Sequence, residues 1–435
     1  MSLGNTHRLL NAKPKFFYGW WIVAAAFLNL FCSTGVIYYG FPVVYPSLIR
    51  SLGFTRAQVT EGFLLGFIVV GLPFGYLAGI LIDTIGARRV ILYGIAFISV
   101  PLFLMGFMTK LWQYEALCLC EVLGYVFAGP IANQVLIARW FRLRRGRAMG
   151  LAYLGLGLGG VISPPLANFL IRTLGWRHAL QAAGVLMLLV LLPMGLAVTR
   201  SSPEDKGLLP DGELPGSEEH IAQIAESSMS TFAAVKTTNF WLILVGSALV
   251  IGAINTVIQH FILFLQDQGY SRTAAAQLLS GLLASSLAGR VLVGYIVDRV
   301  SKKNAMACFY LIIGGAIPLL FLVGLPVAAW SFAVVFGFAM GADYMLIPLV
   351  AAECFGVASL GKLLALIIMG YSVGQWVAPW VAGHLFDRYH SYDAAWKLMA
   401  ASGVVGAMAI YAVAVPQKAL LSIDNARGTS ETAKA

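Results

Sequence analysis

One arginine lies inside an otherwise apolar segment, "LLASSLAGRVLVGYIVDR", which runs from Leu282 to Arg299. A cation at the centre of a membrane costs about 2.5–3.5 kcal/mol on insertion scales, so Arg290 is expected to serve a purpose there. Its guanidinium keeps its charge and offers a planar fork of donors that fits a carboxylate. The residue type and its place predict binding of a small carboxylate anion, and a static salt bridge between helices is the alternative.

Three tyrosines are expected at the same depth in the membrane as Arg290. Counted inward from the outer end of each predicted helix, Tyr125, Tyr344 and Tyr371 fall near the midplane, as Arg290 does. A buried phenol needs a hydrogen-bond partner, which makes each tyrosine a candidate contact for a bound anion. Packing between helices is the ordinary alternative for each of them.

Proton transfer would need a group that titrates, and few acidic or histidine side chains lie within the apolar segments. Asp343 matches Arg290 in depth, Asp267 lies at the outer end of a helix, and His260 lies one to two turns deeper than Asp267. Glu121, in the outer part of another helix, is a further candidate. Asp267 could instead cap a turn and His260 could serve packing, so the residues alone leave the carrier open.

The elements that hold these residues follow from the composition. The chain has 435 residues, of which 59% are hydrophobic and 11% charged, whereas a soluble domain has about 25% charged residues. Apolar runs of roughly 20 residues or more are long enough to cross a bilayer as helices. We predict an all-α membrane protein with 12 transmembrane helices, near residues 18–45, 57–80, 90–108, 112–138, 147–171, 178–198, 240–265, 273–297, 304–324, 328–350, 362–386 and 395–415.

A polar stretch from Thr199 to Thr238 divides these helices six and six. The expected parts are a cytoplasmic N-terminus (1–17), a first six-helix half (18–198), a cytoplasmic linker (199–239), a second half (240–415) and a cytoplasmic tail (416–435). Twenty of the 29 lysines and arginines then lie on the side of both termini, which the positive-inside rule makes the cytoplasm. The net charge of +10 thus indicates a lipid bilayer rather than nucleic acid as partner. The first apolar run is too long for a cleavable signal peptide, so none is expected.

The two halves carry a repeat with a shift of 215 residues. The shift places Asp83 on Asp298 and Gly146 on Gly361, which argues for a duplicated six-helix unit. Arg290 falls on Gly75, so the repeated unit itself does not require an arginine at this position. One residue of slippage aligns "GFTRA" with "GYSRT", and Thr55 and Ser271 are predicted to cap the helices that follow them.

Several other classes of protein are disfavoured by the residues. The five cysteines lie in or at the ends of apolar segments, without a histidine at metal-site spacing, so neither a metal site nor a disulfide is expected. No Ser–His–Asp grouping, HExxH motif or carboxylate pair points to an enzyme, and no ring of charges points to an ion channel. We predict no cofactor and no metal.

The segment "GILIDTIGARR" and its weaker copy "GYIVDRVSKK" resemble the signature loop of the major facilitator superfamily. Parallel six-helix repeats are typical of that fold. The resemblance implies a transporter that works by alternating access. It also implies a gate between helices at the cytoplasmic side, formed by Asp83, Arg88, Arg89, Asp298 and Arg299.

Within that superfamily, "FYGWWIV", "WFRLRRGRAMGLAYLGLGLGG" and "AECFG" resemble the monocarboxylate transporter family and its relatives, bacterial proton-coupled L-lactate symporters among them. The resemblance implies that Arg290 anchors the substrate carboxylate. It also implies a proton carrier, for which Asp267, Asp343 and His260 are the candidates. The chain departs from the animal members at Ser286 and Val43, where those proteins carry an aspartate and a lysine.

Related oxalate–formate exchangers carry a second cation, on helix 11, and "ALIIMGYSVGQWVAPW" has none there. One positive charge suits one carboxylate, because a dianion would keep an uncompensated charge. We therefore predict proton-coupled symport of short monocarboxylates such as L-lactate and pyruvate, in an integral protein of the bacterial inner membrane. An anion exchanger of the oxalate–formate type and a nutrient sensor that does not transport are the alternatives.

Overall fold

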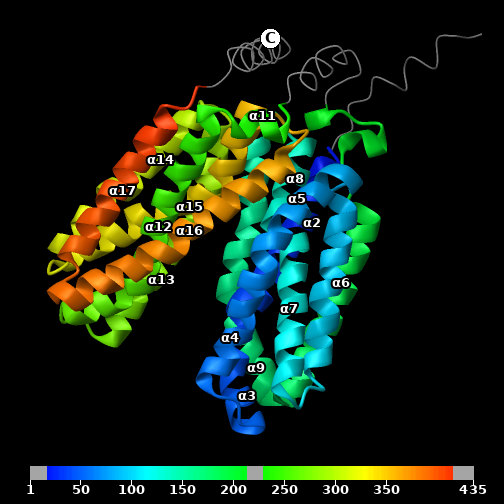
Figure 1. The fold of residues 1–435 in the computed structure, drawn as a ribbon, viewed down its shortest axis with the longest axis horizontal. Coiled ribbons are helices and arrows are strands. Elements are labelled where there is room, and N and C mark those ends of the chain that lie inside the picture. Colours follow the sequence, from blue (N-terminus) through cyan, green and yellow to red (C-terminus); the bar gives the residue numbers. More distant parts are fainter. Residues whose placement is uncertain (1–16, 213–228, 415–435) are drawn as a thin grey trace, which may run out of the picture.

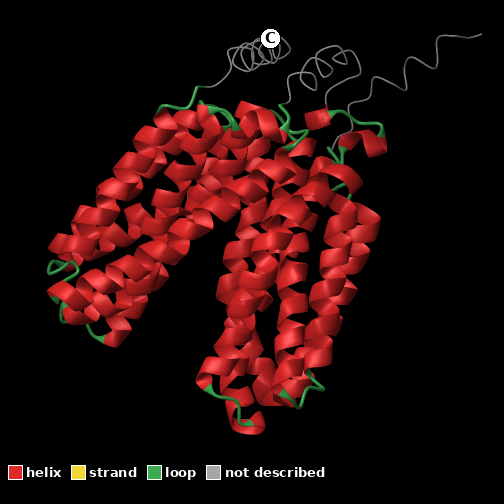
Figure 2. Cartoon of the chain, in the orientation of Figure 1, coloured by secondary structure: helices red, strands yellow, loops and turns green. Residues whose placement is uncertain are grey.

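The computed structural model describes residues 17–212 and 229–414. Within these ranges the chain is built from helices and contains no β-strand (Figure 2). The predicted cytoplasmic N-terminus and tail, and the middle of the predicted linker, lie outside the described residues.

The helices of the first part are α2 (Gly19–Cys32), α3 (Tyr45–Leu52), α4 (Arg56–Gly66), α5 (Leu72–Ile85), α6 (Ala87–Met105), α7 (Leu111–Ala128), α8 (Pro130–Trp140) and α9 (Arg145–Pro193). Those of the second part are α11 (Thr231–Val235), α12 (Thr238–Asp267), α13 (Arg272–Val297), α14 (Lys302–Ala316), α15 (Pro326–Phe355), α16 (Leu360–Tyr389) and α17 (Asp393–Tyr411). A π-helical segment, Ser33–Gly40, and a 3-10 turn, Phe41–Val44, join α2 to α3.

The twelve predicted spans are present in the described ranges, with different boundaries. Ten helical segments are long and apolar enough to cross a membrane, and a pair that bends by 51°, Glu61–Gly71 with Pro73–Ile85, makes an eleventh. One of the ten, Arg145–Val198, has 54 residues, roughly 80 Å of helix, against a hydrocarbon core of about 30 Å. Gly175 breaks that segment with φ of +77° and ψ of 155°, so it is two spans.

Two predicted helix caps are confirmed. The Ser271 hydroxyl accepts a hydrogen bond from the Ala274 N–H at 3.2 Å. The Thr55 hydroxyl accepts from the Gln58 N–H at 3.2 Å, and the Gln58 side chain accepts from the Thr55 N–H at 2.9 Å. Such reciprocal bonds satisfy donors that the first helical turn would otherwise leave free.

The helices form two bundles that converge at one end and diverge at the other (Figure 1). In the first bundle, α9 packs on α2 and α6, and α7 packs on α4 and α6; in the second, α12 packs on α16 and α17, and α13 on α15. The bundles touch mainly along two helix pairs, α5 with α16 and α9 with α13, with smaller contacts of α8 and α9 with α15 and of α8 with α16. We call the end where they converge the closed end and the opposite end the open end.

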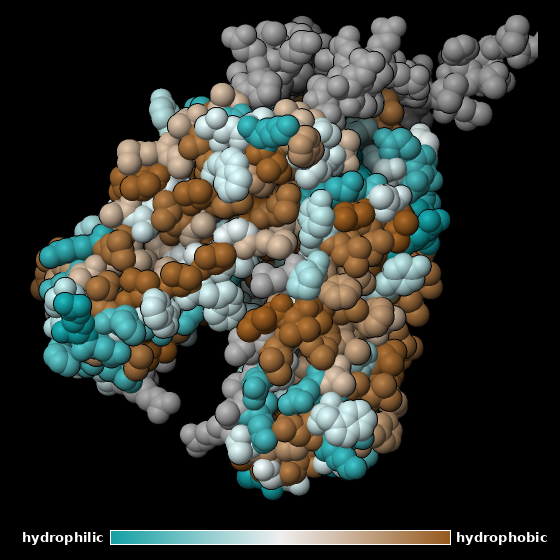
Figure 3. Space-filling model, in the orientation of Figure 1, coloured by the Kyte–Doolittle hydropathy of each residue, from teal (hydrophilic) through white to brown (hydrophobic). Residues whose placement is uncertain are grey.

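The surface agrees with a bilayer-spanning chain. Apolar side chains cover the flanks of both bundles, and polar side chains gather at their tips, on the face that Figure 3 shows. A notch separates the bundles at the open end in the same view. Large exposed apolar residues such as Phe169, Leu189 and Trp380 lie on the helices rather than on loops. An apolar belt of this kind is stable only against lipid.

Candidate functional site

Arg290 lies on α13, where this helix touches α9 of the other bundle. The Arg290 carbonyl faces Gly150, and its guanidinium lies against Gly157, so that a methyl group at either glycine would collide with Arg290. The two glycines are seven residues apart, which is close to two helical turns, and therefore share one face of α9. The close approach of the two helices buries Arg290 to 8% exposure.

The surroundings of this cation hold phenols instead of carboxylates. Tyr39, Tyr344 and Tyr153 are the groups that act on the Arg290 charge. No acidic side chain in the described ranges forms an ion pair with Arg290, and the buried Nη1 atom has no hydrogen-bond partner. The structure therefore offers no salt bridge between helices to explain this arginine. A buried cation without a counter-charge is a strong attractor for an anion.

The three predicted tyrosines lie within electrostatic range of one another, and one of them, Tyr344, is also in range of Arg290. Tyr344 on α15 lies within electrostatic range of the Arg290 guanidinium. Tyr371 on α16 is 7% exposed and lies in range of the phenols of Tyr344, Tyr153 and Tyr125. Tyr125 on α7 packs edge-on against Phe67, with 6.0 Å between ring centroids. The layer thus draws side chains from both bundles.

Two further tyrosines of this layer were not predicted. Tyr153 lies between Gly150 and Gly157 in helical spacing, so the same face of α9 carries all three, and this spacing is a signal in the sequence. Tyr39 stands in the π-helical segment and is 39% exposed. Its place could not be predicted, because a π-helical turn rotates the side chains that follow it.

A carboxylate joins the bundles at the contact of α5 with α16. Asp83, near the end of α5, accepts hydrogen bonds from the backbone N–H groups of Gly361 at 3.2 Å and Lys362 at 3.1 Å, at the start of α16. Arg139 on α8 lies 3.5 Å from the same carboxylate. A helix N-terminus carries free N–H groups and a partial positive charge, so it holds a carboxylate well.

A second carboxylate repeats this arrangement at the contact of α9 with α13. Asp298, directly after α13, accepts from the N–H groups of Gly146 at 2.7 Å and Arg147 at 3.1 Å, at the start of α9. The Arg147 Nε atom lies 3.4 Å from Asp298 Oδ2. Burial raises the pKa of Asp298 to about 6, although both hydrogen bonds and the Arg147 charge act in the opposite direction.

The predicted basic residues of the gate take other places. Arg88 donates to the carbonyls of Gly195 at 3.3 Å and Leu196 at 2.7 Å, and so ties α6 to the end of the sixth span. The side chains of Arg89 and Arg299 are exposed. Arg139 and Arg147, which the sequence reading missed, supply the charges beside the two aspartates.

The model of a known family matches most of the chain. The "Major Facilitator Superfamily" model matches residues 22–353. The chain belongs to the Major Facilitator Superfamily. It is therefore an integral membrane transporter and not an enzyme.

Curated relatives of this facilitator include animal and fungal transporters. The chain is 25% identical over 420 residues to "Monocarboxylate transporter 12" of Homo sapiens, covering 89% of this chain and 78% of that protein. It is 26% identical over 369 residues to "MFS-type transporter 1" of Ophiocordyceps sp., covering 79% and 73%. The E. coli fucose:proton symporter FucP matches with a TM-score of 0.67 at 15% identity, over 91% of this chain and all of that one, which supports the fold.

Asp343 of this facilitator points toward α14, away from the layer that holds Arg290 and Tyr344. It is 0% exposed on α15, and neither carboxyl oxygen has a hydrogen-bond partner. The phenol of Tyr310 on α14 lies beside it and donates to the Ser247 hydroxyl at 3.3 Å. Asp343 is therefore directed into the second bundle, away from Arg290, while the adjacent Tyr344 lies beside that arginine.

The other proton candidates lie nearer the open end. His260 contacts the Tyr392 hydroxyl through Nδ1 and the Pro379 carbonyl through Nε2, each at 3.1 Å. A carbonyl only accepts, so Nε2 carries hydrogen and donates to it. Asp267 is exposed at the end of α12, while Arg290 lies roughly 27 Å along α13 from the start of that helix. The structure does not bring either group to Arg290.

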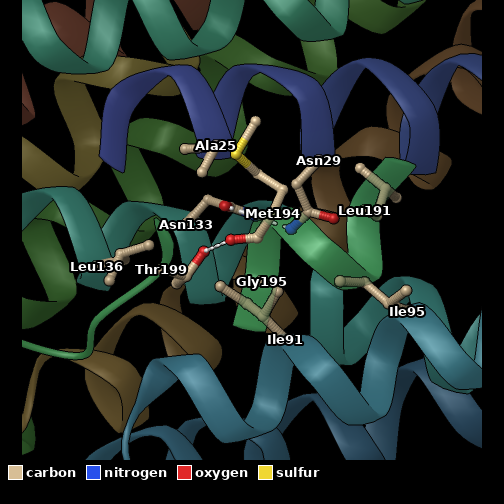
Figure 4. Close-up of a pocket in the computed structure, with 11 residues that line it drawn as sticks. Ala25, Asn29, Ile91, Ile95, Asn133, Leu136, Leu191, Met194, Gly195 and Thr199 are labelled. Carbon is tan, nitrogen blue, oxygen red and sulfur yellow. Dashed lines mark hydrogen bonds between the residues drawn. The ribbon is translucent and has the colours of Figure 1, made fainter. Parts of the chain in front are cut away.

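One small cavity lies inside the first bundle, apart from Arg290 (Figure 4). It is lined in part by Asn29, Asn133 and Thr199, and Asn29 Nδ2 donates to Asn133 Oδ1 at 3.4 Å. The cavity has room for one water molecule but not for a substrate. Among the described residues, no group of three His, Cys, Asp or Glu side chains is placed to hold a metal ion.

Proposed function

We propose that this transporter is a proton-coupled symporter of short monocarboxylates such as L-lactate and pyruvate. The substrate carboxylate binds the guanidinium of Arg290 in two parallel hydrogen bonds. The observation that carries the proposal is a cation 8% exposed, at the contact between the bundles, with no acidic partner in the described ranges. The phenols of Tyr125, Tyr344 and Tyr371 complete the site.

A single carboxylate is the substrate class that matches this charge. Arg290 is the cation of the layer, and Tyr371 occupies the place on α16 where a second cation would be expected for a dianion. A dicarboxylate would enter with one charge uncompensated in a medium of low dielectric constant. The relative named "Monocarboxylate transporter 12" supports the same class.

Transport proceeds by alternating access between two halves, residues 18–198 and 240–415. The excess of lysine and arginine places the closed end and both termini in the cytoplasm. The structure is then open to the outside, and Asp83 and Asp298 hold the cytoplasmic end shut through the helix starts that they cap. The choice of a bacterial inner membrane stays a prediction, since the relatives named above are animal and fungal.

Asp343 is the carrier that we favour for the proton. Its carboxyl group is fully buried, with the Tyr310 phenol beside it and no cation paired with it among the described residues, so a negative charge there would be costly and uptake of a proton relieves that cost. Symport with one proton makes the uptake of a monocarboxylate electroneutral. Entry of the anion alone would be opposed by about 2.3 kcal/mol per 100 mV of inside-negative potential.

Uptake of labelled L-lactate into proteoliposomes, driven by an acidic exterior, tests the proposal. Arg290→Lys should lose most of the uptake and at least tenfold in affinity by calorimetry, because lysine keeps the charge but not the fork. Arg172→Lys, an exposed change on α9, is the control and should behave as the parent. Equal affinity in parent and Arg290→Lys would refute the anchor. Strong competition by oxalate would favour an exchanger, and binding without uptake a sensor.

The proton carrier is tested by separating exchange from accumulation. Asp343→Asn should keep the exchange of labelled for unlabelled lactate and lose accumulation driven by the pH gradient. Asp267→Asn, an exposed position, is the comparison and should keep both. If the Asp343 variant accumulates lactate like the parent and the Asp267 variant does not, Asp267 is the carrier. If both accumulate it, His260 is the next candidate.

A further inference from the structure

A glutamine bridges the two bundles beside the proposed anion site. Gln134 lies on α8 and is 3% exposed. Its side-chain amide nitrogen donates to the hydroxyl of Tyr153 on α9 and to the carbonyl of Tyr344 on α15, the latter at 3.3 Å. Arg290 contacts Gly150 and Gly157, on the face of α9 that also carries Tyr153. The phenols of Tyr153 and Tyr344 lie within electrostatic range of its charge. Gln134 therefore belongs to the same layer of the molecule.

These contacts fix which way the amide points. The Tyr344 carbonyl can only accept a hydrogen bond, so the group facing it must be the NH₂ of Gln134. The amide oxygen, Oε1, is then the atom left over, and it is buried without a hydrogen-bond partner. A buried acceptor without a donor costs about 1–3 kcal/mol, so this atom calls for a partner that the protein does not supply.

Three polar groups in this layer can thus each make one more hydrogen bond, two of them as donors and one as an acceptor. Arg290 Nη1 is a buried donor without an acceptor, and Gln134 Oε1 is a buried acceptor without a donor. The Tyr153 hydroxyl accepts from Gln134, which leaves its own hydrogen free to donate. A ligand that satisfies all three carries a carboxylate to accept from Arg290 and Tyr153. It also carries a hydroxyl to donate to Gln134.

We propose that Gln134 selects 2-hydroxy acids over 2-oxo and unsubstituted acids, by accepting the hydrogen bond of the substrate hydroxyl at Oε1. This inference rests on the proposed function, since it assumes a carboxylate on Arg290. A 2-oxo acid presents an acceptor where Gln134 also accepts, and an unsubstituted acid presents nothing. One hydrogen bond of this kind corresponds to about threefold to tenfold in affinity.

Calorimetry with L-lactate, pyruvate and propionate tests the inference. The parent protein should bind lactate threefold to tenfold more tightly than either of the other two. Gln134→Met, which keeps length but removes the acceptor, should bring the lactate-to-propionate ratio close to one. Propionate affinity reports any general loosening of the site in that variant, because propionate never uses Oε1. The ratio therefore separates recognition of the hydroxyl from a structural role of Gln134.

Asn133→Leu is the matched control, because Asn133 is the adjacent buried amide and its side chain donates to the Ala128 and Gly129 carbonyls inside the first bundle. This change should leave the affinity ratio unchanged. An equal ratio in the parent and in Gln134→Met, as expected if water occupies Oε1, overturns the inference and leaves the proposed function standing. If none of the three acids binds the parent protein, it is the proposed function that fails.

Discussion

The two contacts between the bundles are built from the same parts. At the contact of α5 with α16, a methyl group on Gly79 would meet the Gly361 carbonyl oxygen at 2.6 Å, and Asp83 caps α16. At the contact of α13 with α9, a methyl group on Gly294 would meet the Gly146 carbonyl oxygen at 2.8 Å, and Asp298 caps α9. The repeat of 215 residues relates each glycine and aspartate to its counterpart.

Two differences separate these contacts. The arginine beside Asp298 is on the opposite bundle, on α9, whereas the arginine beside Asp83 is on α8 of its own bundle. The cation that we propose to bind the substrate is also present at one contact only. Arg290 lies two helical turns before Asp298, and the residue that corresponds to Arg290 at the other contact is Gly75. The contact of α9 with α13 therefore includes both the proposed substrate-binding arginine and part of the closed end. The contact of α5 with α16 includes only part of the closed end.

The largest effect is expected from a methyl group at each contact. Gly150→Ala should displace the Arg290 backbone, lowering lactate affinity at least tenfold, because overpacking by one methyl group costs about 1–3 kcal/mol. Gly79→Ala should slow pH-driven uptake but change the affinity less than threefold. Calorimetry and uptake on both variants check this. Equal losses of affinity would show that the two contacts do not differ.

The next effect is a dependence of closure on pH. The pKa of Asp298 is raised to about 6 in the closed contact, from an ordinary value of 3.8. The contact thus binds the proton more tightly than a state in which Asp298 meets water. Closure should be favoured as the pH falls from 7 to 5 and lost as the pH rises through 6, by about threefold to tenfold.

Spin labels can measure that shift. Cysteines introduced at the exposed positions Lys110 and Lys397, with the exposed Cys308 replaced by serine, report the separation of the bundles at the open end. The fraction of long distances should rise on acidification in the parent and in Asp83→Asn. The rise should be lost in Asp298→Asn. A rise that survives in the Asp298 variant would assign the pH response to another group.

The smallest effect is expected from the two arginines. Arg147→Gln removes an ion pair between bundles and the stacking of this arginine on Tyr295, whose ring centroid is 4.8 Å from its Cζ atom. The closed-end contact should weaken about twofold to fivefold, as partly exposed pairs contribute about 1 kcal/mol or less. Arg139→Gln breaks a pair within one bundle and should leave closure as it is. The same spin-label distances check both, and a larger shift from Arg139→Gln would reverse the comparison.

The sequence predicted the features that depend on local pattern. The twelve spans were predicted from the length of the apolar runs. Asp83 and Asp298 were predicted from the repeat of 215 residues, which places the same segment in both halves. Arg290 could be singled out because a cation within an apolar run has few ordinary explanations. The caps at Thr55 and Ser271 are likewise local, since each involves residues at most three apart in the chain.

Features that depend on how the bundles meet could not be predicted. Arg139 and Arg147 appear in the sequence within one basic stretch, and only the contact geometry selects them from their neighbours. The direction of Asp343 could not be predicted, because the face of α15 toward Tyr310 is as apolar as the others. Gln134 is one polar residue in "PIANQVLIARW", and its role depends on a carbonyl 210 residues away.

The empty space at Gly75 bears on how this protein diverged after its duplication. Among the described residues, no atom outside the neighbouring turns of its own helix lies within 4 Å of the place where a side chain would begin at Gly75. The repeat thus has two equivalent positions, and only one of them, Arg290, carries a charged residue. A mutation at one of two equivalent positions can change substrate recognition, while the glycine and aspartate contacts that both halves share are kept. Internal symmetry in this family therefore provides spare positions from which new transport specificities can evolve.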